Sequence, residues 1–134
     1  STEERVMLKN WTDFYKANRG LLHTGRTVRT EHSDRNAFLH GVVSTDQSEA
    51  LFMLAQLRPS EFSRPANIRL TGLSNDATYE VRVVEPAGAA IPMQTVAPRW
   101  YEGVRLTGAV LSTIGLKSPV LRPEQALLIQ VKKV

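Results

Sequence analysis

The stretch from Ile68 to Glu85, IRLTGLSNDATYEVRVVE, constrains the fold of this chain more than any other. At both of its ends apolar and polar residues alternate with a period of two, which is typical of β-strands with one buried face. Between them lie turn formers, including Gly72, which can adopt a positive φ. Leu73 is the large apolar residue of this corner, so we expect it to close one end of a core, together with Tyr79. The stretch predicts a strand, a corner and a second strand.

Further runs of strand character occur along the rest of the chain, separated by turn residues such as Thr45–Ser48. The run Glu49–Leu57 is apolar on both faces, which predicts a central strand or one that is covered on both sides. Together the runs predict a mainly β fold, an antiparallel β-sandwich of about seven to eight strands with one N-terminal amphipathic helix. The other expected strands are Gly25–Glu31, Phe38–Ser44, Gly103–Thr107, its continuation Ala109–Leu111 after a bulge at Gly108, and Ala126–Val131. A long irregular loop is expected over Pro86–Arg99.

The helix is predicted at the N-terminus, over residues 1 to about 19. Ser1 and Glu4 have the spacing of a capping box, and Gly20 is expected to end the helix. Four apolar side chains fall on one stripe of this helix: Met7, Trp11, Phe14 and Tyr15. A single amphipathic helix before a sheet needs a surface to pack on, so these four residues are the predicted domain interface.

Composition limits the classes of function. The chain has 134 residues, of which 42% are hydrophobic and 22% charged, as expected for one globular domain. The absence of cysteine excludes disulfides and thiolate catalysis, and it fits a cytoplasmic location. The net charge of +4 comes from arginines spread singly along the chain, which argues against a nucleic-acid surface. No apolar run is long enough to span a membrane, and the charged N-terminus is not a signal peptide.

Few residues have the spacing of a reactive site. His23, His32 and His40 share no metal-ligand spacing, so neither a metal nor a cofactor is expected. Asp34 and Asp46 lie in turn contexts, where an aspartate usually bonds the backbone. The adjacent aromatics Trp100 and Tyr101 have two interpretations. They could stack on a sugar ring, or Trp100 could hold the preceding loop over one end of the sandwich.

Two resemblances can be drawn. The stretch LTGLSNDATYEVRVV resembles the tyrosine corner of fibronectin type III domains. A broader similarity covers nearly the whole chain, and it is to the C-terminal part of the melibiase-type α-galactosidases, glycoside hydrolase family thirty-six. The segments that carry it are LKNWTDFYKANRGLLHTGR, GVVSTDQSEALFMLAQL, RLTGLSNDATYEVRVVEP and VRLTGAVLSTIGLKSPVLRPEQALLIQV, in this order.

The second resemblance implies a domain organisation. Residues 1–24 would be the end of an upstream (β/α)8 barrel and its connector, and residues 25–134 would form the closing sandwich. The family's retaining hydrolysis of α-galactosides uses two barrel aspartates, so no catalytic residue transfers to this chain. The implied partner is the upstream barrel, and an uncovered helix stripe could also cause self-association. A carbohydrate-binding module and a fibronectin-like interaction domain remain the alternatives.

Overall fold

The computed structural model describes residues 1–30, 32, 34–60, 65–84, 98–119, 121, 123 and 125–134. The predicted class is confirmed, because the fold is mainly antiparallel β with one long N-terminal helix. The described residues form six strands rather than seven to eight. In chain order the elements are α1 (Thr2–Thr24), β1 (Arg26–Thr30), β2 (Ala37–Val43), β3 (Glu49–Gln56), β4 (Thr78–Val84), η1 (Arg99–Glu102), β5 (Val104–Thr107), α2 (Gly108–Thr113) and β6 (Ala126–Lys133).

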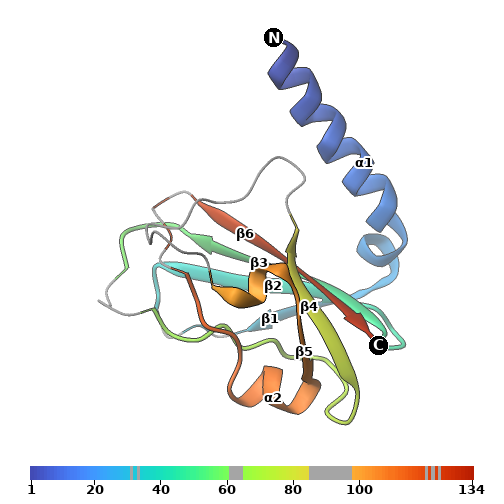
Figure 1. Ribbon diagram of the computed structural model, residues 1–134, viewed down its shortest axis with the longest axis vertical. Coiled ribbons are helices and arrows are strands. Elements are labelled where there is room, and N and C mark those ends of the chain that lie inside the picture. The colour runs from blue at the N-terminus through green and yellow to red at the C-terminus, as the bar shows by residue number, and fades with distance from the viewer. Residues whose placement is uncertain are drawn as a thin grey trace.

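The six strands form one antiparallel sheet in the order β1-β2-β3-β6-β4-β5 (Figure 1). The C-terminal strand β6 therefore lies in the middle, with β3 on one side and β4 on the other. Its alternating burial puts Leu127, Ile129 and Val131 into the core. Since β6 joins the two halves of the sheet, the sheet is complete only when the end of the chain is in place.

The core lies on one face of this sheet. Alternate residues of each strand point into it, among them Phe52 of β3 and Val81 of β4. Among the described residues, the layer that covers this face consists of the segment before β4, the short helix α2 and the segment after it. The buried residues that these segments contribute are Ile68, Leu70, Leu73, Leu111, Leu116 and Leu121.

The corner before β4 has the turn glycine and the buried leucine that the sequence predicts. Gly72 has a φ of 89°, and Leu73 is buried in the core. Tyr79 is fully buried, and its hydroxyl donates a hydrogen bond to the Gln47 carbonyl (2.7 Å) and accepts one from the Ser74 amide (3.0 Å). The tyrosine therefore joins the corner to the β2–β3 turn, which is the role expected of it.

The strand predicted over residues 68–71 is wrong. Ile68 makes only an isolated bridge with Leu116, and the Leu70 amide donates to the Leu111 carbonyl in α2. Alternation of apolar residues reported correctly which side chains are buried. It could not report that the backbone partners are a helix and a turn instead of a neighbouring strand.

The continuation of β5 through Ala109–Leu111 is also wrong, because the chain turns into α2 at Gly108. The Thr107 hydroxyl caps this helix by accepting a hydrogen bond from the Val110 amide (3.2 Å). A Cβ atom on Gly108 would lie 2.0 Å from the Ser74 carbonyl oxygen, so the chain passes the corner at backbone contact. Close approach, rather than a bulge, explains this glycine.

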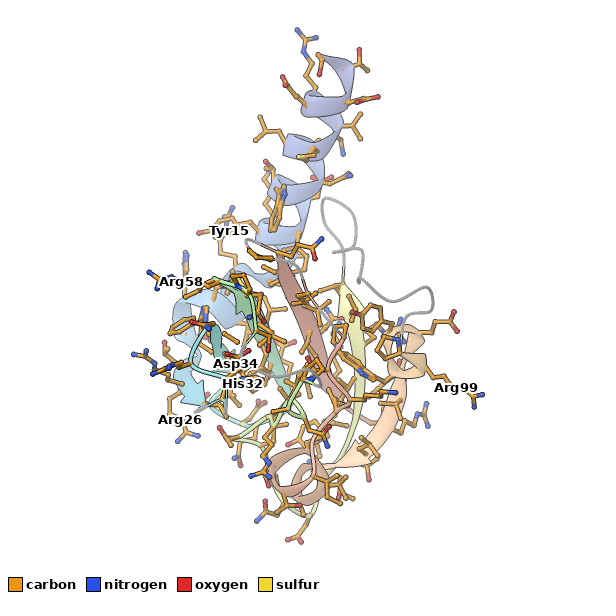
Figure 2. The ribbon with its side chains drawn as sticks, turned by 90° about the vertical axis from the view of Figure 1, so that its left-hand side faces the viewer. Tyr15, Arg26, His32, Asp34, Arg58 and Arg99 are labelled. Carbon is orange, nitrogen blue, oxygen red and sulfur yellow. The ribbon has the colours of Figure 1, made fainter. Side chains whose placement is uncertain are left out.

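The long helix α1 begins as predicted, with the capping box between Ser1 and Glu4. It does not end at Gly20, but continues to Thr24, where the Gly25 amide donates to the Leu21 carbonyl (2.8 Å). An exposed mid-helix glycine costs only about 1 kcal/mol relative to alanine, and burial of Leu21 offsets this cost. Most of α1 projects away from the sheet (Figures 1 and 2).

Candidate functional site

The projecting helix carries an apolar stripe that is only partly covered. Met7, Trp11, Phe14 and Leu21 follow one another at intervals of four, three and seven residues, with Asn18 completing the stripe. Leu21 is only 6% exposed, whereas Trp11 is 45% and Met7 48% exposed. The same face of the helix thus packs on the domain at its C-terminal end and is open to solvent at its N-terminal end.

Two aromatic contacts order the exposed half of α1. Trp11 and Phe14 meet edge to face, with ring centroids 6.3 Å apart. Tyr15 flanks the stripe, and its hydroxyl is hydrogen-bonded to His23 Nε2 (2.7 Å), while the Arg19 guanidinium lies 5.5 Å from its ring centroid. The helix therefore presents its aromatic side chains in fixed positions.

The end of α1 lies on the face of the sheet that is turned away from the core. Leu21 and Leu51 are both buried, yet neither belongs to the core cluster. Leu51 alternates with core residues along β3, so it points to the opposite face. A Cβ atom on Gly25 would lie 2.5 Å from Val42 Cγ1, a side chain of that same face. The helix therefore packs over the end of β2.

The structure places the two predicted sugar-contact residues on η1. Trp100 is 7% exposed and belongs to the core cluster, and its Nε1 donates to the Lys117 carbonyl (2.7 Å). Tyr101 is half-buried, and the two rings lie at 72° with centroids 5.0 Å apart. Trp100 thus attaches η1 to the segment after α2. The loop expected before it lies outside the described residues up to residue 97.

Asp34 is the buried acid of the described residues, and it joins two loops. It is 2% exposed and accepts hydrogen bonds from the Ser60 hydroxyl (2.6 Å), the Asn36 amide (2.9 Å) and Gln56 Nε2 (3.5 Å). Burial raises the pKa of Asp34, but these hydrogen bonds outweigh it and hold the pKa below its usual value. Asp34 and its neighbour His32 lie at the end of the sheet that also carries Arg58 (Figure 2).

A cavity of about 690 Å³ lies next to the hydrogen bonds of Asp34. It is lined by Arg35, Asn36, Leu57, Arg58 and Pro59. Its lining has no carboxylate pair of the kind that cleaves glycosides. The predicted turn role of Asp34 is confirmed by its bond to the backbone of Asn36, two residues further on. Asp34 therefore holds the loop before β2 and the segment after β3 together.

Asp46 has the same turn role at the opposite end of β2. Its carboxylate accepts hydrogen bonds from the Ser48 hydroxyl (2.6 Å), the Ser44 hydroxyl (2.8 Å) and the Ser48 amide (3.0 Å). These bonds favour the ionised form and lower the pKa of Asp46 to about 2. Such a carboxylate stays charged at neutral pH and stabilises the turn, so it is unsuited to proton transfer.

Within the described part of the chain, no three histidine, aspartate or glutamate side chains are grouped so that they could hold a metal ion. In the same residues, no helix combines the length and the apolar character needed to cross a bilayer.

Known proteins resemble the chain in sequence and in fold. The sequence profile of the glycosyl hydrolase family 36 C-terminal domain matches residues 39–130, which is more than half of the chain. The chain belongs to this family. The family 36 domain is 34% identical over 125 residues to an α-galactosidase of Escherichia coli, a match that covers 89% of the chain and 18% of that enzyme.

Solved structures show the same fold. An α-galactosidase of Geobacillus stearothermophilus, AgaA, in complex with raffinose aligns with a TM-score of 0.74 and 23% identity, over all of this chain and 16% of AgaA. The galactosidase domain of an α-galactosidase–sucrose kinase aligns with a TM-score of 0.73 and 21% identity, with the same coverage. The family 36 domain thus spans 16–18% of the length of these relatives.

The sequence interpretation missed how far the stripe extends. The glycine signal at Gly20 predicts the end of the helix and places Leu21 in a connector, although its distance of seven residues from Phe14 continues the stripe. The predicted interface residues Met7, Trp11 and Tyr15 are exposed as that interpretation requires.

Proposed function

We propose that this chain is the non-catalytic C-terminal domain of an α-galactosidase, and that it packs on the catalytic (β/α)8 barrel of the same enzyme. The parent enzyme would hydrolyse terminal α-galactosides. The proposal is supported by family membership and by the α-galactosidase names of the relatives, which are five to six times longer than the matched region.

The observation that carries the packing role is the α1 stripe, which runs along one face of the helix from Met7 to Leu21. Its C-terminal part is sealed on the sheet, and its N-terminal part exposes Met7, Trp11 and Tyr15. A monomeric surface rarely leaves several large apolar side chains together without a partner. We propose that Met7, Trp11, Phe14 and Tyr15 contact the barrel, so that residues 1–24 connect the two parts and residues 25–134 form the accessory domain.

The test uses the full-length protein and this chain by itself. The full-length protein should release galactose from raffinose, and the isolated chain should release none. In the full-length protein, Trp11→Glu should weaken the attachment of the domain and lower the thermal midpoint of the enzyme. Lys16→Glu, a charge change on the opposite side of α1, is the matched control and should leave the midpoint unchanged. A full-length protein inactive on every terminal α-galactoside would contradict the activity, and equal effects of the two variants would contradict the interface.

We also propose that the enzyme works in the cytoplasm, which is supported by a sequence without cysteine. Cell fractionation with an antibody against the domain tests the location, and recovery in the medium or in the periplasm would contradict it.

A further inference from the structure

The sheet has a second face, opposite the core, which we call the outer face. The strand register places five of its residues in one row, from β1 through β2, β3 and β6 to β4. In this row, the side chains from β2, β3, β6 and β4 are half-buried. The row consists of Arg29, His40, Met53, Leu128 and Val84.

The neighbouring row lies beneath the end of α1. It contains Val42 and Leu51, which are paired across β2 and β3. Leu51 is buried although it points away from the core, and the end of α1 packs on its partner strand β2 beside Val42. The outer face is therefore already an interface at one end, and the Met53 row lies directly beside it.

The centre of the outer face is unusually apolar. The solvated face of an antiparallel sheet is normally polar, with apolar residues on the core side only. Here Phe38, Val42, Met53, Leu128 and Val84 all belong to the outer face. This composition explains why the segment that forms β3 is apolar on both sides in the sequence.

The margin of the outer face is charged. At the β4–β5 side, Glu80 is paired with Arg82 and lies 3.6 Å from Arg105, and at the β1 side Arg29 lies over the Phe38 ring at 4.8 Å. An apolar centre with a charged, solvated rim is the usual anatomy of a protein–protein interface. The outer face thus has the composition of a docking surface, and it lies directly beside the part of the sheet on which α1 packs.

We infer that the Met53 row of the outer face and the exposed part of the α1 stripe form one docking surface, and that one body covers both: the upstream catalytic domain. The inference rests on the proposed function. It adds the outer face of the sheet to the contact that the proposed function places on α1. Two observations favour this occupant. The relatives have more than 80% of their length outside the matched region. The stripe faces the sheet at Leu21 and keeps the same face of the helix up to Met7, so a body that contacts Trp11 lies on the side of the outer face.

Two methionines make the halves of this surface separately measurable, since Met7 lies in the stripe and Met53 in the outer-face row. Hydroxyl-radical oxidation, read by mass spectrometry, is compared between the full-length protein and the isolated chain at micromolar concentration. Both methionines should be oxidised at least about fivefold more slowly in the full-length protein, because an interface core packs like a protein interior. Ile114, exposed directly after α2, should react equally in both and is the control.

Each outcome decides a different point. Slower oxidation of both methionines supports the inference. Protection of Met7 with unchanged Met53 overturns it and leaves the proposed docking of α1 intact, whereas unchanged oxidation of both overturns the two proposals together. Protection of Met53 in the isolated chain that increases with protein concentration would identify a second copy as the occupant and also overturn the inference.

Discussion

At the scale of single residues, Tyr79 is the most consequential polar group of the fold. It is fully buried, and its hydroxyl both donates to Gln47 and accepts from Ser74. A buried partner that loses its hydrogen bond costs more than the bond itself contributes, because it is left without water. The hydroxyl therefore fixes the corner to the β2–β3 turn.

Replacement Tyr79→Phe should destabilise the domain by about 1–3 kcal/mol, the cost of leaving buried backbone groups without a partner. The measurement is the free energy of unfolding in urea. Tyr15→Phe removes a hydroxyl from the exposed end of α1, where water can replace the bond to His23, and is the matched control. Equal losses in the two variants would show that the corner bonds contribute nothing specific.

The lowered pKa of Asp46 predicts how the stability of the domain changes at acid pH. Its pKa is lowered to about 2 in the folded chain from an ordinary value near 3.8. The stabilisation by its hydrogen bonds is therefore fully present above pH 3.8 and is lost as the pH falls through about 2. An NMR titration should give a midpoint near 2 for this carboxyl, and Ser48→Ala should move it upward. A midpoint near 4 in the unaltered chain would contradict the role of the two serines.

At the scale of elements, two glycines in helices have opposite reasons to be there. A Cβ atom on Gly108 would meet the Ser74 carbonyl at 2.0 Å, whereas one on Gly20 would have nothing within 4 Å. The glycine is thus required at the start of α2, where backbones touch. In α1 it only lowers helix propensity.

The same substitution should accordingly have opposite signs at these positions. Gly108→Ala should destabilise the domain by about 1–3 kcal/mol, since the backbone of the corner must move. Gly20→Ala should stabilise α1 by about 0.5–1 kcal/mol. Thermal unfolding of the two variants, followed by far-ultraviolet circular dichroism, measures both. A stabilising Gly108→Ala would show that the corner yields at little cost.

How much could be predicted from the sequence differs between elements. Alternation located β2, β3, β4 and β6, because their burial depends on side chains that the sequence displays. It failed for Ala109–Leu111 and for Ile68–Thr71, where a long-range backbone contact decides the conformation. The end of α1 was misplaced since a local glycine signal competes with burial of Leu21, and that burial is a tertiary effect. The spacing of apolar residues predicts an interface on α1, and the apolar run of β3 indicates cover on both faces. The row that crosses five strands depends on the strand register, which the sequence does not display.

At the scale of the whole molecule, the domain leaves an apolar surface uncovered when it is by itself. The exposed large apolar residues cluster on α1, namely Val6, Met7, Leu8, Trp11 and Tyr15. Two turns of helix bury less area than the roughly 1,200–2,000 Å² of a stable specific interface. Association of free domains through this stripe should therefore be weak and should depend on concentration.

Sedimentation equilibrium of the isolated chain should detect this association as an average mass that rises with concentration. Trp11→Lys should abolish the rise, because it places a charge at the centre of the contact without disturbing the core. Ile114→Lys replaces another exposed apolar residue, directly after α2, and should leave the association unchanged. If the chain stays monomeric at high concentration, or if the two variants behave alike, the stripe is not the surface that seeks a partner. The assignment of α1 as the docking helix would then lose its physical basis.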